Sequence, residues 1–152
     1  MALIRHPLLA AAAALLGLAA AVPAPVFAAA HSSGQSLTLS ATNTGTSDQV
    51  TLAFTGPVPA LTVSDSDNEP VGIGSGKPHP IGDSTHYVHL ACPQGCWSGQ
   101  ITNGVPFEQL PQVRGAFPQS FEGELAIDIG LAQQAGYGVS TQGGSVIVTV
   151  QH

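Results

Sequence analysis

Charged side chains are scarce in this sequence. Asp, Glu, Lys and Arg make up 8% of the chain, against about 25% in an ordinary soluble domain. After Arg5, the basic residues are Lys77 and Arg114 alone. Phosphate backbones are bound by clusters of Lys and Arg, so the composition excludes nucleic acid as a partner.

The sequence also lacks an apolar run of the roughly 20 residues that a helix needs to cross a bilayer. A shorter apolar run at residues 8–22 follows Arg5 and ends at two prolines and the small residues 26–30. This order is typical of a secretory signal peptide. We therefore expect residues 1–30 to be removed by cleavage after Ala28 or Ala30. Residues 31–152 would then form a single periplasmic or secreted domain without stable membrane insertion.

Helical periodicity is missing after residue 30, and short β-rich runs replace it. Several of these runs alternate apolar and polar residues, as half-buried strands do. They lie at residues 36–40, 50–55, 61–63, 87–90 and 125–129. Two more, at 137–142 and 145–150, flank Gly143-Gly144, which is a hairpin signal. The pattern predicts an all-β fold, a small sandwich or partly open barrel of roughly seven or eight short antiparallel strands.

Two stretches rich in Gly and Pro predict long loops, at residues 72–83 and 106–118. The acidic stretch 65–69 begins like a calcium loop, but Pro70 stands where the EF-hand requires Gly. We expect a solvated turn there instead.

The two cysteines lie close together, in the string Cys92-Pro-Gln-Gly-Cys96. In an oxidising compartment, paired thiols usually become disulfides. The Pro-x-Gly turn can bring the sulfurs together, and closing so small a loop stabilises a fold by roughly 2 kcal/mol. A Cys92–Cys96 disulfide is the first interpretation of this string.

A copper site is the alternative, because thiolates and imidazoles suit Cu(I). His86 and His89 precede the two cysteines, and His31 would be the new N-terminus after cleavage at Ala30. The string is similar to the Cys-Pro-x-x-Cys loop of Sco-type copper chaperones. A strand over residues 87–90 would, however, point the two histidines to opposite faces. Both interpretations stay open at this point.

Catalytic motifs are absent: the sequence has neither a Gly-x-Ser-x-Gly elbow nor a His-Glu-x-x-His pair. We expect no enzymatic activity and no required cofactor, apart from copper under the alternative. For ligand contact the best candidates are Trp97 and Tyr87, since half-exposed Trp and Tyr carry much of the energy of binding sites.

Four stretches resemble AMIN domains, which are small periplasmic β-sandwiches. They are residues 49–58, 112–117, 124–129 and 137–148. Residues 124–129 resemble that family's V-x-x-V/L-x-D-L/I strand, and residues 137–148 its Y-x-V-x-x-x-G-x-x-L/I-x-V hairpin. The family's Arg before its central strand is missing, since His86 or Tyr87 stands there, and no functional residue is carried over.

The resemblance implies attachment to the cell envelope through peptidoglycan, without catalysis. The sequence thus predicts a non-enzymatic envelope binding or assembly module, with an envelope glycan or envelope protein as its partner. A periplasmic copper-binding protein is the alternative.

Overall fold

The structure is a computed structural model that describes residues 34–101, 104–107 and 110–152. The predicted signal peptide and His31 lie outside these residues. Ten strands are present in the described part of the chain. They are β1 (Ser36–Asn43), β2 (Ser47–Phe54), β3 (Thr62–Ser66), β4 (His86–Cys92), β5 (Gln100–Ile101), β6 (Val105–Pro106), β7 (Val113–Phe121), β8 (Glu124–Leu131), β9 (Tyr137–Gln142) and β10 (Ser145–Gln151).

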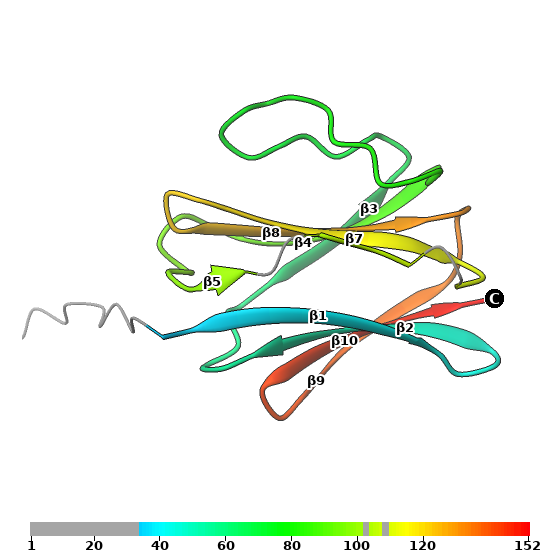
Figure 1. Cartoon of the computed structure of the whole chain (residues 1–152), viewed down its shortest axis with the longest axis horizontal. Helices are drawn as coiled ribbons and strands as arrows, with labels where there is room; N and C mark the ends of the chain where they lie inside the picture. The colour runs from blue at the N-terminus through cyan, green and yellow to red at the C-terminus, as the bar shows by residue number, and fades with distance from the viewer. Residues whose placement is uncertain (1–33, 102–103, 108–109) are drawn as a thin grey trace, which may run out of the picture. The chain divides into compact units, whose positions relative to one another are not determined.

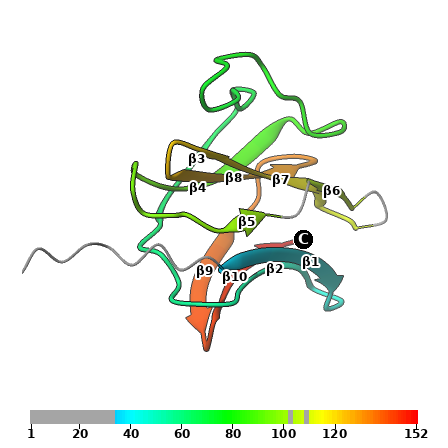
Figure 2. The same cartoon turned by 60° about the vertical axis from the view of Figure 1, so that its left-hand side comes forward.

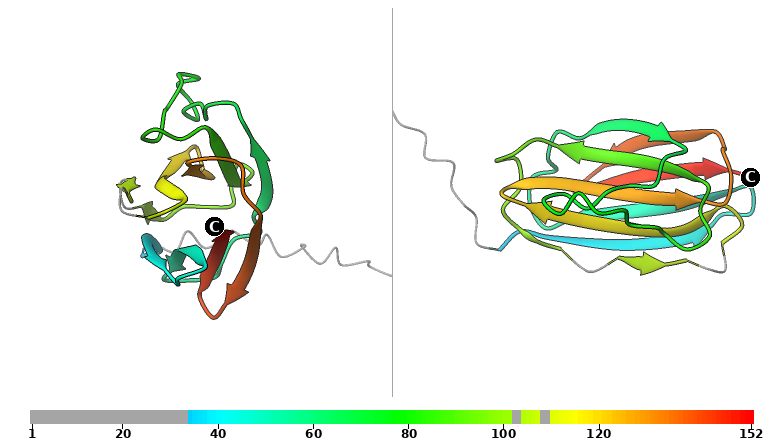
Figure 3. Two further views of the ribbon diagram at one scale, coloured as in Figure 1. Left: turned by 90° about the vertical axis from the view of Figure 1, so that its right-hand side faces the viewer. Right: turned by 90° about the horizontal axis from the view of Figure 1, so that it is seen from above.

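The strands form two sheets that pack face to face as a sandwich, which confirms the predicted all-β fold (Figure 1). The first sheet has the order β5-β1-β2-β10-β9 and the second β3-β4-β8-β7-β6. Every pairing is antiparallel except that of β1 with β5. Figure 3 shows the two layers end-on and from above.

The core is formed by side chains that alternate along the strands between buried and more exposed positions. In β2 and β10 every second residue is buried, and β4 and β8 bury Val88, Leu90, Ile127 and Ile129 completely. Burying each such side chain stabilises the fold by about 1.5–3 kcal/mol. The sandwich therefore depends on the inner faces of β2, β4, β8 and β10.

The prediction of a loop over residues 106–118 is wrong for its second half, because Val113–Phe121 is the strand β7. Pro118 misled the prediction, since proline cannot donate to a ladder and usually interrupts strands. Here Pro118 is paired with Ile127 of β8, whereas β6 reaches only Gly115 and Ala116 on the other side. Pro118 therefore lies where β7 has become an edge strand.

The chain between β3 and β4 is confirmed as a long loop, and it rises above the second sheet on the side away from the first (Figure 2). A bridge between Val71 and Pro78 closes part of it. Gly130 of β8 allows this loop to pack closely on the sheet, because a Cβ at that position would overlap Ser84 Oγ and lie 2.9 Å from Ile81. None of the residues that the structure describes belongs to an apolar helix of membrane-spanning length.

Candidate functional site

The cysteine turn is closed by a disulfide, as predicted. Cys92 ends β4, its Cα lies 6.1 Å from that of Cys96, and the two sulfurs are bonded. The next residue, Trp97, donates its backbone N–H to the carbonyl of Gly123 at 3.0 Å. The disulfide thus holds the turn against the hairpin between β7 and β8.

Trp97 and Tyr87 are both buried, each with 2% of its surface exposed. The Trp97 ring meets Phe54 edge-on, with centroids 5.5 Å apart. The Tyr87 hydroxyl donates to the carbonyl of Ser84 at 3.1 Å, and burial, followed by the charge of Glu69, raises the pKa of Tyr87. The aromatic platform predicted at these two residues is therefore not present in this structure, because their faces pack inside the fold.

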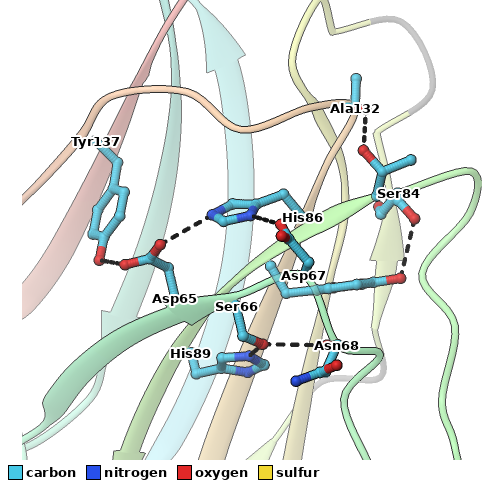
Figure 4. A network of polar contacts seen from close by, with 11 residues as sticks. Asp65, Ser66, Asp67, Asn68, Ser84, His86, His89, Ala132 and Tyr137 are labelled. Atoms are coloured by element: carbon cyan, nitrogen blue, oxygen red, sulfur yellow. Dashed lines mark hydrogen bonds and ion pairs between the residues drawn. The ribbon is translucent and has the colours of Figure 1, made fainter.

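His86 is buried between two carboxylates at the edge of the sandwich. Its Nε2 lies 3.1 Å from Asp65 Oδ2, and its Nδ1 lies 2.6 Å from Asp67 Oδ1. Asp65 also accepts a 2.8 Å hydrogen bond from the Tyr137 hydroxyl, and this bond is the first cause of a raised Tyr137 pKa. Since Tyr137 begins β9 and Asp65 belongs to β3, the cluster joins the edge strands of the two sheets (Figure 4).

His89 belongs to a second cluster, on the outer face of the same strand. Its Nδ1 lies 2.6 Å from Asp128 Oδ1, and its Nε2 lies 3.0 Å from Ser66 Oγ. The other oxygen of Asp128 accepts a 3.1 Å bond from the Gln119 amide. Gln119 Oε1 in turn accepts the Ile73 N–H at 2.9 Å. A row of polar side chains on β3, β4, β8 and β7 therefore anchors the long loop.

The structure does not bring the predicted copper ligands together. Both sulfurs are in the disulfide, and His86 and His89 face opposite sides of the second sheet. In the described part of the chain no three His, Cys, Asp or Glu side chains are grouped to hold a metal ion. His31 is outside that part.

One cleft lies between the loop at residues 79–83 and strands β6 and β7. It has a volume of about 550 Å³. The rings of His79 and Phe117 are in contact in its wall, with centroids 3.4 Å apart and planes tilted by 32°. Arg114 also lines it, held by Asp83 at 3.0 Å and by the carbonyl of Leu110 at 2.7 Å. The cleft thus combines an aromatic wall with one fixed cation.

The smaller cleft, of about 310 Å³, lies between loop residues 68–73 and the outer faces of β4 and β8. Ser66, His89 and Asp128 all line it. Its other walls are largely apolar, and Glu69 and Glu124 add two carboxylates. The second histidine cluster is therefore accessible from this cleft.

Sequence reasoning missed Ser66, Asp128, His79 and Phe117. Asp128 alone gave a signal in the sequence, because it is a charged residue between Ile127 and Ile129 in the middle of a mostly apolar strand. The other three depend on which loop folds over which face, and no local pattern encodes that. Comparison with family models, with curated proteins and with solved structures finds no match.

Proposed function

We propose that this protein is an exported, envelope-associated binding domain and that a cell-envelope glycan binds in the larger cleft. One observation carries the proposal: the His79–Phe117 pair and Arg114 converge on a cleft of about 550 Å³. Aromatic faces pack on the C–H faces of sugar rings, and a few fixed polar groups orient such ligands. The resemblance to AMIN domains independently favours peptidoglycan.

The charge of the chain fits a ligand that is mostly neutral and hydroxyl-rich. The formal net charge is −6, and the cleft offers one cation whose charge is already balanced by Asp83. Recognition would then depend on stacking and hydrogen bonds more than on charge. Binding to glycan should accordingly change little between low and moderate salt.

The experiment is co-sedimentation of the full expressed chain with purified peptidoglycan, in wild-type form and as Phe117→Ala. Loss of the aromatic wall should weaken binding about tenfold, equivalent to about 1.4 kcal/mol. Phe121→Ala is the matched control, because Phe121 is on the same strand, is 48% exposed and lines neither cleft. Equal binding by wild type and Phe117→Ala would contradict the proposal, as would a wild type that does not sediment.

A further inference from the structure

The second histidine cluster has the connectivity of a nucleophilic triad. Ser66 Oγ is 3.0 Å from His89 Nε2, and His89 Nδ1 is 2.6 Å from Asp128 Oδ1. Hydrolases that use serine have the hydroxyl on one imidazole nitrogen and a carboxylate on the other, and unrelated folds have arrived at this order. Three strands supply the residues here, β3, β4 and β8 (Figure 4 shows Ser66 and His89).

The surroundings fix the orientation of each group. Asp128 is 5% exposed and carries its second hydrogen bond from Gln119. With the Asp128 oxygen as acceptor, the tautomer that fits both contacts carries its proton on His89 Nδ1 and leaves Nε2 to accept one. Ser66 Oγ also donates to the carbonyl of Asn68 at 3.3 Å, a longer contact than the 3.0 Å to His89 Nε2. The hydroxyl therefore has two acceptors, and proton transfer to the imidazole uses the nearer of them.

The cluster is open to a ligand. The cleft of about 310 Å³ is lined by all three residues, and the His89 side chain is 26% exposed. Asn68 lines the same cleft. Its side-chain amide is the N–H donor that we assign to a developing oxyanion, because side-chain amides have this role in other hydrolases. The volume suits a short acyl group.

We propose that Ser66, His89 and Asp128 form a hydrolytic site for neutral or cationic esters of short acyl chains. Ser66 Oγ attacks the ester carbonyl carbon while His89 Nε2 takes the hydroxyl proton. The ester C–O bond then breaks, and the leaving alcohol takes that proton from His89. Water, deprotonated by His89, attacks the acyl-Ser66 ester, which releases the carboxylic acid and returns the proton to Ser66.

The charge of the substrate follows from the cleft. Glu69 and Glu124 line it together with Asp128, and neither Lys nor Arg is among its lining residues. An anionic acyl group would be repelled, whereas a cationic leaving group would be attracted. This activity goes beyond the proposed glycan binding, which uses the other cleft. It also departs from the expectation of a non-enzymatic domain.

The test begins with the wild-type full chain and a fluorophosphonate probe, followed by mass spectrometry of the labelled peptide. Ser66 should carry the label. In parallel, hydrolysis of p-nitrophenyl acetate and butyrate should fall about 100-fold or more in Ser66→Ala and in His89→Gln. Ser64→Ala is the matched control, because Ser64 is an exposed serine of the same strand that does not line the cleft. It should keep the wild-type rate within about twofold.

Two further readouts separate catalysis from a merely structural role. Asp128→Asn should lower kcat and alter the pH–rate profile, because His89 loses the partner that selects its tautomer. Wild type should hydrolyse the cationic substrate acetylthiocholine faster than the anionic p-nitrophenyl hemisuccinate. Glu124→Gln should lower the ratio of these two rates. Ser66→Ala should keep glycan binding, and Phe117→Ala should keep hydrolysis, so that the two proposals can fail separately. An unlabelled Ser66, or equal hydrolysis by wild type and Ser66→Ala, would overturn the triad.

Discussion

Asp48 is a buried carboxylate that connects the two sheets. It lies on the inner face of β2 and has no exposed surface. Its Oδ2 accepts the backbone N–H groups of Gln112 and Val113, at 2.7 and 3.0 Å, where β7 of the other sheet begins. Its Oδ1 lies 3.0 Å from His152 Nε2. Replacement of Asp48 should therefore weaken two attachments at once, that of the start of β7 and that of His152.

The size of the effect follows from these contacts. Hydrogen bonds to an ionised group contribute about 1.5–3 kcal/mol each, and a buried N–H that loses its acceptor costs about 1–3 kcal/mol. Asp48→Ala leaves the backbone N–H groups of Gln112 and Val113 without their acceptor. The free energy of unfolding should therefore fall by about 3–6 kcal/mol. Asp48→Asn keeps one acceptor oxygen and should lose about 2 kcal/mol. Because domains of this kind are stable by only about 5–15 kcal/mol, the Ala variant should be close to unfolding.

Urea unfolding followed by Trp97 fluorescence measures these differences, since the ring is buried in the folded state. At roughly 4 °C per kcal/mol, the melting temperature of Asp48→Ala should fall by about 15 °C. Asp83→Asn is the control, because the Asp83 side chain is 80% exposed and its pair with Arg114 contributes under about 1 kcal/mol. If Asp48→Ala lost no more stability than Asp83→Asn, the argument from buried acceptors would be refuted.

Three other changes test separate parts of the fold. Cys92→Ala/Cys96→Ala should lower the unfolding free energy by about 2 kcal/mol, and reductant should then have no further effect in thermal melts. The hydrogen bond from Tyr137 to Asp65 raises the tyrosine pKa in the folded state above 10.0. Stability should thus fall as pH rises above about 10, where the unfolded chain ionises first, and Tyr137→Phe should show a weaker fall in alkaline melts. Gly130→Ala should displace the loop above β8 and speed its cleavage by protease, and unchanged cleavage would count against close packing there.

Strands whose inner residues alternate with polar ones could be predicted from the sequence. The runs that became β1, β2, β4, β8 and the β9–β10 hairpin all carry this alternation, and the turn at Gly143 and Gly144 falls where expected. β7 was missed because a proline such as Pro118 normally ends a strand, and only the strand pairing shows that Pro118 lies at an edge. Local patterns therefore predicted the all-β class and most of the strands, but they left a sandwich and a partly open barrel both open, and they could not show where an edge would tolerate proline.

The candidate sites were much less predictable from the sequence than the strands. The disulfide is local and was predicted from the spacing of Cys92 and Cys96. Ser66, His89 and Asp128 stand 23 and 39 residues apart and meet only through the pairing of β3 with β4 and of β4 with β8. The burial of Trp97 depends on how the turn closed by the Cys92–Cys96 disulfide packs against β7 and β8. Composition gives no information about either arrangement.

The place of β10 in the first sheet has a consequence for the timing of folding. β2 needs β10 as its second neighbour, and the paired residues Asp48 and Val150 are about a hundred positions apart in the chain. The N-terminal strands are synthesised before β10, so the first sheet stays incomplete until β10 is available. Long-range pairings of this kind slow folding. The β1–β2 hairpin should consequently expose its apolar face until β10 pairs with it, and a chaperone would be needed most during this period.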